Sequence, residues 1–167
     1  LVMIGHAERR ERFGETDLTV NRRVLAASRN NLDVLICVGD SANDKAYEVT
    51  KERLIIQLKI AVSGLSAQQM SRVWIAYEPA WAIGEGSIAA DPEFVDEMHG
   101  VLRTTLTTLF PEIGEKSPIL YGGSVNSNNT VEIIQQPQID GLFIGRAAWD
   151  ADNFNKLIRQ VIKKIDL

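Results

Sequence analysis

The chain has 167 residues, a formal net charge of −4 and 45% hydrophobic residues. This length is enough for one domain with a sizeable core, and the mild acidity argues against a nucleic-acid partner, whose phosphates require clustered Lys and Arg. No apolar run approaches the roughly 20 residues that cross a bilayer, so a membrane is not an expected partner. The single Cys excludes an internal disulfide. Because Leu1 opens directly on an apolar, strand-like run, we expect a truncated chain or a further N-terminal part.

Short apolar runs, rich in β-branched residues, alternate with segments that carry one apolar stripe at helical spacing. A helix is also expected to start just after His6, and Asp91 followed by Pro92 is a helix-start signal. In chain order, the predicted elements are strand 1–5, helix 17–29, strand 34–39, helix 43–63, strand 73–77, helix 91–110, strand 119–122, strand 142–145 and helix 151–165.

The alternation predicts an α/β fold. Five strand–helix units in a row imply a parallel sheet with right-handed crossovers. No linker interrupts the chain, so residues 1–167 are predicted to form a single domain. Periodicity alone does not decide between a doubly wound open sheet and part of a barrel.

Two polar residues directly follow predicted strands. Glu78 follows strand 73–77 and precedes Pro79, and His6 follows strand 1–5. Parallel α/β sheets bind ligands at the carboxyl ends of their strands, so both side chains are candidates for chemistry. The helix expected behind His6 presents its positive end to the imidazole, which favours the uncharged ring.

Three glycine-containing turns also follow strands, at residues 83–86, 121–124 and 145–146. Each can turn backbone N–H groups toward one anion. One such turn is weak evidence, whereas three beside a Glu and a His favour a phosphate site.

Several of these segments together resemble the signatures of the triosephosphate isomerase family, in the same order and spacing. They are GHAERR at 5–10, CVGD at 37–40, YEPAWAIG at 77–84, YGGSV at 121–125 and DGLFIG at 140–145. The resemblance covers essentially the whole chain. It implies a (β/α)8 TIM barrel, of which this chain supplies about five βα units, strands 4–8, and therefore an incomplete barrel.

The resemblance also implies a reaction, the cofactor-independent interconversion of glyceraldehyde 3-phosphate and dihydroxyacetone phosphate through an enediolate. In the scheme that the resemblance implies, Glu78 is the base and neutral His6 donates to the substrate oxygens. No cofactor and no metal are implied. The expected setting is a cytoplasmic homodimer that acts in glycolysis and gluconeogenesis on a small phosphorylated sugar.

Further site residues come from the resemblance alone. The residues implied to bind the substrate phosphate are Gly84, Ser124, Gly145 and Arg146. Those implied to form a lid and its latch are Pro79, Ala80, Trp81, Ala89 and Tyr121.

The chain departs from the family pattern at several points. Ala7 stands where the family usually has Ser, and Arg146 stands where it has a second Gly, as in the branch that isomerises tetrulose phosphates such as erythrulose phosphate. The family's first three strands, with an Asn-x-Lys that binds substrate, would precede Leu1. We therefore expect the isolated chain to be inactive and poorly soluble.

Alternative readings stay open. These are a tetrulose-phosphate isomerase, a non-catalytic truncated fragment and an anion-binding α/β module without chemistry. Among the remaining residues, His99 is expected to be exposed, and Cys37, Trp74 and Trp149 are expected to serve packing.

Overall fold

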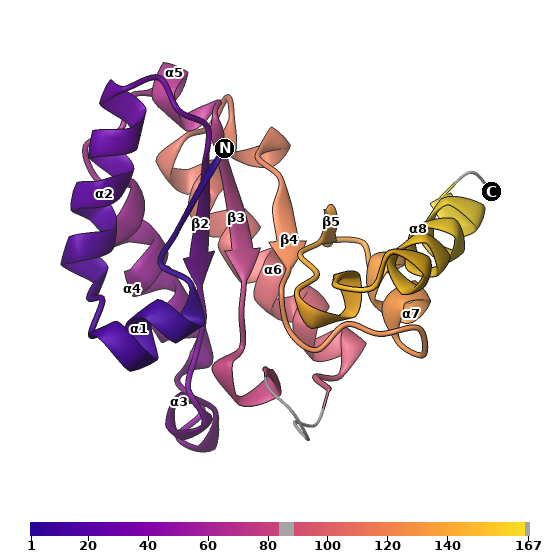
Figure 1. Ribbon diagram of the computed structural model, residues 1–167. Coiled ribbons are helices and arrows are strands. Elements are labelled where there is room, and N and C mark those ends of the chain that lie inside the picture. The colour runs from indigo at the N-terminus through magenta and orange to yellow at the C-terminus, as the bar shows by residue number, and fades with distance from the viewer. Residues whose placement is uncertain (84–88, 166–167) are drawn as a thin grey trace.

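The computed structural model describes residues 1–83 and 89–165 and contains one five-stranded parallel sheet. Its strands are β1 (Val2–Ile4), β2 (Val34–Val38), β3 (Val73–Tyr77), β4 (Ile119–Tyr121) and β5 (Gly141–Leu142). The arrowheads of β2, β3 and β4 point the same way in Figure 1, so the carboxyl ends of the strands meet at one end of the sheet.

The order of the strands in space follows their order in the chain. Every described strand pairs in parallel with the next one, from β1 to β5. A doubly wound sheet reverses its strand order at a switch point, and the described strands do not. The topology therefore favours part of a barrel, the alternative that periodicity could not select.

The helices that connect the strands pack against one another in sequence. The described α-helices are α1 (Ala7–Phe13), α2 (Asp17–Arg29), α3 (Ala42–Ala46), α4 (Thr50–Val62), α5 (Ala67–Met70), α6 (Pro92–Leu109), α7 (Thr130–Ile134) and α8 (Ala151–Ile165). Short 3-10 helices are η1 (Ala80–Ala82), η2 (Gly114–Lys116) and η3 (Arg146–Ala148). Helix α4 packs on both α2 and α6, and α4 and α6 lie behind the strands in Figure 1. Within the described ranges, no helix is long and apolar enough to cross a membrane.

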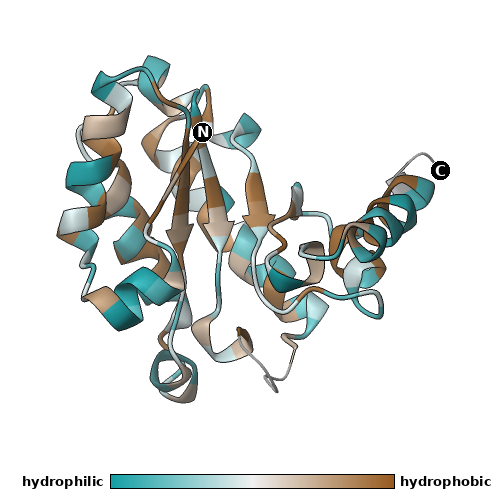
Figure 2. Cartoon of the chain, in the orientation of Figure 1, coloured by the Kyte–Doolittle hydropathy of each residue, from teal (hydrophilic) through white to brown (hydrophobic). Residues whose placement is uncertain are grey.

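The main core lies between the sheet and these helices. Alternate strand residues such as Ile36 and Ile75 point to the helices and are fully buried with Leu54. The residues between them face the other side of the sheet, where a smaller cluster holds Leu35, Cys37 and Ala76. Figure 2 shows the central strands in hydrophobic colours, as expected for parallel strands with apolar side chains on both faces.

Two predicted helices start at the caps that the sequence supplies. Asp91 accepts hydrogen bonds from the backbone amides of Glu93 and Phe94 at 3.0 and 3.2 Å, and Pro92 follows at the first helical position. Thr16 caps α2 through a reciprocal pair of hydrogen bonds with Thr19. The helices predicted over 17–29 and 91–110 are confirmed, since α2 and α6 span these segments.

The single helix predicted over 43–63 is wrong, because the structure divides it into α3 and α4. Glu48 adopts a left-handed φ of 59° between them, and Tyr47 just before it is 77% exposed. The Thr50 hydroxyl donates to the buried Asp40 carboxylate at 2.8 Å, which fixes the start of α4. This tertiary contact has no signature in the periodicity.

The last strand also differs from its prediction over 142–145. Strand β5 covers Gly141–Leu142, and the amide of Phe143 extends the pairing with a 2.8 Å hydrogen bond to the carbonyl of Tyr121. The chain then turns into η3, which begins at Arg146. Helix α7 was not predicted, because five residues are too few to show a helical period.

Candidate active site

His6 and Glu78 meet at the carboxyl ends of β1 and β3. The Nε2 atom of His6 lies 3.1 Å from Oε1 of Glu78, and the backbone amide of Ala7 donates to Oε2 at 3.0 Å. Nδ1 of His6 accepts a hydrogen bond from the amide of Glu8 at 3.2 Å, because His6 is the N-cap of α1. A neutral imidazole in this arrangement carries its proton on Nε2, the nitrogen that faces Glu78.

Glu78 is only 2% exposed. Burial raises its pKa above the usual range, although His6, the Ala7 amide and the neighbouring Cys37 each act to lower it. Cys37 is fully buried, as expected for a packing residue, and burial raises the pKa of its thiol, with the Glu78 charge adding to the effect. A carboxylate with a raised pKa is a stronger base, which suits proton abstraction near neutral pH.

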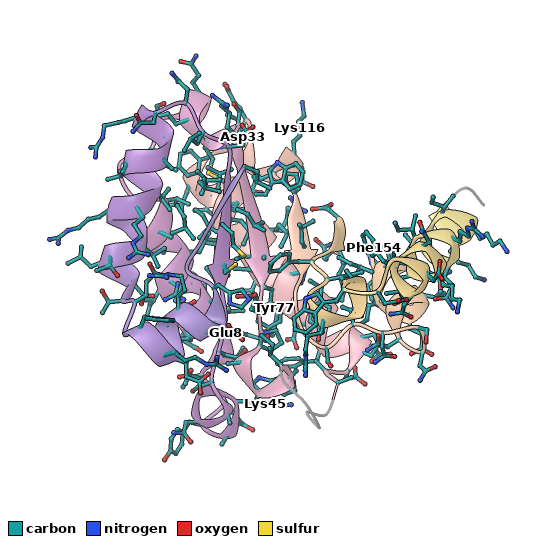
Figure 3. The ribbon with its side chains drawn as sticks, viewed as in Figure 1. Glu8, Asp33, Lys45, Tyr77, Lys116 and Phe154 are labelled. Carbon is teal, nitrogen blue, oxygen red and sulfur yellow. The ribbon has the colours of Figure 1, made fainter. Side chains whose placement is uncertain are left out.

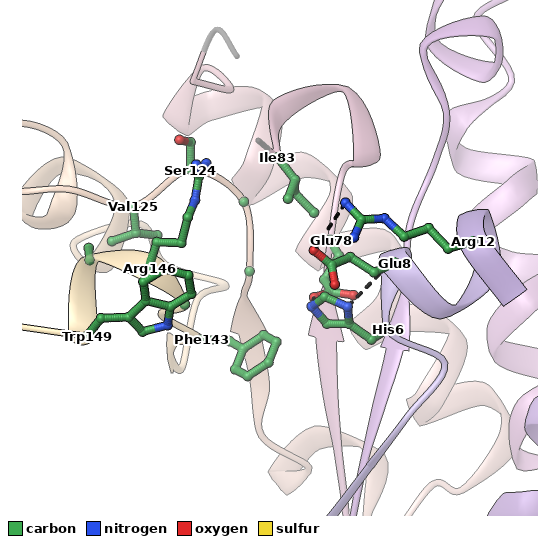
Figure 4. A pocket seen from close by; sticks show the side chains of 14 residues that line it. His6, Glu8, Arg12, Glu78, Ile83, Ser124, Val125, Phe143, Arg146 and Trp149 are labelled. Carbon is green, nitrogen blue, oxygen red and sulfur yellow. Dashed lines mark hydrogen bonds and ion pairs between the residues drawn. The ribbon is translucent and has the colours of Figure 1, made fainter. Parts of the chain in front are cut away.

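A cavity of about 700 Å³ opens beside this pair. Figure 4 shows His6 and Glu78 on one side of it and Ser124, Arg146 and Trp149 on the other, with Phe143 between them. The lining thus comes from the ends of β1, β3, β4 and β5, so distant parts of the sequence share one hollow.

Two glycines make room for the pair and for a neighbouring tyrosine. A Cβ on Gly122 would approach Cγ of Glu78 to 3.0 Å, so a larger residue would push the carboxyl group aside. A Cβ on Gly123 would come within 2.1 Å of the Tyr121 hydroxyl. The turn 121–124 therefore requires glycine at both positions for steric reasons, in addition to any role toward an anion.

The residues expected to bind phosphate divide into three that line the cavity and one that cannot be placed. Ser124, Gly145 and Arg146 all line it, and Gly145 has open space around its Cα. Gly84 lies outside the described residues. The structure therefore brings Ser124, Gly145 and Arg146 to the same hollow as His6 and Glu78.

The residues expected to form the lid and latch lie around the cavity rather than on its wall. Pro79 is buried, whereas Ala80 and Ala89 are exposed. Trp81 and Ala80 line a second cavity of about 430 Å³, to whose wall Glu78 also contributes. Tyr121 is fully buried, and burial raises its pKa to about 12. Residues 84–88, between Ile83 and Ala89, lie outside the described residues.

Sequence reasoning missed Asp40, which organises the segment after Glu78. The residue is 1% exposed, and its carboxylate accepts hydrogen bonds from the Tyr77 hydroxyl at 2.9 Å and the Trp81 indole at 3.0 Å. Its backbone carbonyl accepts from the amide of Ala80 at 2.9 Å. The sequence could have indicated Asp40 as a site residue, because it lies just after β2, much as Glu78 lies just after β3.

Two charged residues on α1 also line the first cavity without having been predicted. Arg12 and Glu8 lie one helical turn apart, with Nη2 of Arg12 3.9 Å from Oε1 of Glu8 (Figure 4). Arg12 could not be predicted as a cavity residue, because the extent of α1 was not predicted. Arg9 and Arg10 form ion pairs with Glu15 at 3.3 Å and Asp17 at 2.6 Å, as structural residues do.

Three expectations for individual side chains are wrong. His99 is fully buried between the rings of Tyr77 and Tyr121, with centroid distances of 6.0 and 6.5 Å, and burial lowers its pKa to about 4. Trp149 is 81% exposed and Trp74 is 41% exposed, so neither is a core residue of this chain. Both were assigned to packing because large aromatic residues usually serve it.

The described residues hold no group of three His, Cys, Asp or Glu side chains that could bind a metal ion. The polar groups on the cavity wall are instead an imidazole, carboxylates, guanidinium groups, a hydroxyl and the turns that contain glycine. Such a set can move protons and hold an anion.

Comparison with known proteins agrees with this arrangement. The family model described as triosephosphate isomerase matches residues 1–161. The triosephosphate isomerase of Acetivibrio thermocellus is 45% identical over 95% of this chain and 63% of its own length. The L-erythrulose-1-phosphate isomerases of Mesorhizobium japonicum and Rhizobium rhizogenes are 41% and 40% identical, over 92% and 99% of this chain.

These relatives are longer than the chain, which spans 60–63% of the three proteins named. The resemblance inferred from short motifs is thus confirmed over almost the whole chain, and with it the α/β fold of five consecutive barrel units. The chain belongs to the triosephosphate isomerase family.

Proposed function

We propose that the full-length protein is a cofactor-independent aldose–ketose isomerase that interconverts glyceraldehyde 3-phosphate and dihydroxyacetone phosphate through an enediolate. The observation that carries this proposal is the 3.1 Å approach of His6 Nε2 to Glu78 Oε1 on the wall of the cavity that Ser124 and Gly145 also line. Membership of the isomerase family supports the same reaction class.

Glu78 acts as the base in the proposed reaction. Its carboxylate takes a proton from the carbon next to the substrate carbonyl, and the C–H electron pair forms the double bond of the enediolate. Burial, which raises the pKa of Glu78, increases its basicity in the ionised form. The π electron pair of the carbonyl passes to its oxygen as the enediolate forms. The proton then returns from Glu78 to the neighbouring carbon, while a proton moves between the two substrate oxygens beside His6, so that the former hydroxyl becomes the new carbonyl.

His6 stabilises the charge that develops on oxygen. The substrate oxygens take the place of the direct His6–Glu78 contact and receive a hydrogen bond from Nε2–H. The Glu8 amide holds Nδ1 as an acceptor, so the donor is fixed in advance of the reaction. Donors arranged before charge appears favour the transition state over the ground state.

The substrate phosphate binds on the opposite wall. Ser124, Gly145 and Arg146 supply its donors there, together with Gly84 from outside the described residues. Pro79, Ala80, Trp81, Ala89 and Tyr121 are proposed to form the lid and latch that exclude water from the enediolate. The family resemblance also supports a homodimer, a cytoplasmic location and a place in glycolysis and gluconeogenesis; sedimentation of the full-length protein tests the homodimer.

A second candidate substrate is an erythrulose phosphate. Arg146 brings a guanidinium group to the cavity wall, and two relatives about 40% identical are named L-erythrulose-1-phosphate isomerase. The Arg146 side chain, at a position where the family usually has Gly, is the feature that favours a sugar phosphate other than a triose phosphate.

Coupled assays of the full-length protein on the triose and tetrulose phosphates separate the candidates. Substitution of Glu78 with Gln is expected to lower kcat by at least about 100-fold, since general-base catalysis contributes roughly 10²–10⁴-fold. The exposed Glu132 on α7 provides a matched control, and Glu132→Gln should leave turnover unchanged. Turnover of neither substrate by the parent protein would support the non-catalytic or anion-binding readings.

A further inference from the structure

Lys45 on α3 lies against two aromatic rings near the proposed base. Its Nζ is 3.4 Å from the centroid of the Trp81 ring and 5.3 Å from that of Phe94. The two rings meet edge to face with centroids 5.9 Å apart. A cation over the face of Trp is attracted by the negative charge density of the ring. One ammonium group thus joins α3, η1 and α6.

The edge of the same Trp81 ring is held as well. Its indole N–H donates to Oδ2 of Asp40 at 3.0 Å, and Asp40 is 1% exposed. Asp40 and Lys45 belong to one short segment, in which Ser41 and Asp44 cap α3 by reciprocal hydrogen bonds. Residues 40–45 therefore supply both the acceptor at the edge of the ring and the cation on its face.

These contacts lie on either side of Glu78 in the chain. Tyr77, the residue before Glu78, donates its hydroxyl to Asp40 at 2.9 Å, and Ala80, two residues after it, donates its amide to the Asp40 carbonyl. Trp81 follows within η1. Figure 3 labels Tyr77 near the ends of the strands and Lys45 below it. Residues 77–81 are thus tied to the Asp40 segment at three points.

We infer that Lys45 is a positioning residue for Glu78, acting through the ring of Trp81 to fix the segment that carries the proposed base. Lys45 does not line the cavity of His6 and Glu78, so its effect falls on the placement of the carboxylate and not on substrate contacts. The catalytic part of this inference rests on the proposed function. The part of the inference that concerns the position of the Glu78 carboxylate does not depend on the proposed function.

The test compares three variants of the full-length protein. Lys45→Met removes the charge and keeps an unbranched apolar side chain, while Lys45→Arg retains a cation that can stack on Trp81. Lys51→Met is the matched control, because Lys51 pairs with Glu97 at the surface at 2.5 Å. Lys45→Met is expected to lower kcat about two- to fivefold with KM unchanged, the size of effect that an exposed cation–π contact supports. Lys45→Arg restores kcat, and Lys51→Met leaves it at the parent value.

Two further measurements do not depend on turnover. In Lys45→Met the indole N–H of Trp81 exchanges faster with solvent, because the ring is no longer held on its face. The carboxyl carbon of Glu78, followed by NMR across pH, titrates with a pKa closer to the ordinary Glu value, since its burial is less well maintained. Lys51→Met changes neither quantity.

The outcomes are distinguishable from those of the proposed function. A parent protein that turns over neither sugar phosphate refutes the isomerase proposal, and the Glu78 titration still decides whether Lys45 positions the carboxylate. Identical Glu78 titration in Lys45→Met and the parent overturns the inference, whatever the indole exchange shows. Unchanged kcat in an active enzyme overturns it equally.

Discussion

The Glu78 carboxyl group is buried, and burial disfavours its charged form. The pKa of its carboxyl is raised by burial, so the folded protein holds this proton more tightly than the unfolded chain does. As the pH rises past the pKa of Glu78 in the unfolded chain, the free energy of unfolding therefore decreases. A residue that does not titrate would cause no such decrease. The two donors from His6 and Ala7 offset part of this cost.

This conflict predicts how Glu78→Gln changes stability. The free energy of unfolding of Glu78→Gln, relative to the parent, should increase as pH rises from 4 to 8, because only the parent must ionise a buried carboxyl. Each pH unit between the folded and unfolded pKa values corresponds to about 1.4 kcal/mol. Urea titrations of the two full-length proteins at several pH values measure the difference; a difference independent of pH would contradict the raised pKa.

His99 predicts the opposite pH dependence. Its pKa is about 4 in the folded protein against 6.5 ordinarily, so the unfolded chain binds the proton first as the pH falls. Stability should therefore fall between pH 6.5 and 4, by about 3 kcal/mol for such a displacement. His99→Phe keeps a ring between Tyr77 and Tyr121 and should flatten this part of the profile. An equally steep profile in His99→Phe would rule out His99 as the cause.

The elements of the fold were predictable where the pattern is local. Strand β3 and helices α2 and α6 follow from apolar runs, apolar stripes and cap residues in the sequence itself. The break between α3 and α4 was not predictable in this way. It depends on a hydrogen bond from Thr50 to Asp40, which lies in the loop between β2 and α3.

The same dependence makes Thr50 a test of the element boundary. Thr50→Val removes a hydroxyl donor from a buried carboxylate, and hydrogen bonds to charged groups contribute roughly 1.5–3 kcal/mol. The full-length variant is expected to lose about 2 kcal/mol of unfolding free energy. Thr50→Ser retains the hydroxyl and should lose less than half of that. Equal losses in both variants would place the cost in packing and not in the hydrogen bond.

At the scale of the site, the motifs predicted which residues share one hollow but not how they are linked. His6, Glu78, Ser124 and Arg146 line one cavity because the parallel strands end together. The sequence did not predict the role of the buried acceptor Asp40 or the contact of Lys45 with the Trp81 ring, because each depends on partners that are distant in sequence. The burial of His99 was not predicted for the same reason.

For the molecule as a whole, the sheet presents an incompletely covered apolar face. Trp74 pairs in register with Leu35, and its side chain is 41% exposed; Met3 is 47% exposed. The chain spans 60–63% of the three relatives named above. That residues 1–167 form a single domain of an incomplete barrel stays a prediction.

The 167-residue chain is accordingly expected to self-associate through this face. Exposed apolar side chains such as Trp74 and Met3 favour association when they form a contiguous patch. Light scattering on the 167-residue chain tests this property. A monodisperse monomer at high concentration would contradict this prediction.

Proton transfer by Glu78 is tested most directly by isotope incorporation. The full-length protein is incubated with dihydroxyacetone phosphate in D2O, and deuterium on carbon is followed by NMR. The enediolate mechanism predicts deuterium at the carbon that exchanges its proton with Glu78, in the parent and in Glu132→Gln but not in Glu78→Gln. Isomerisation without deuterium uptake, or equal uptake in Glu78→Gln, would contradict it.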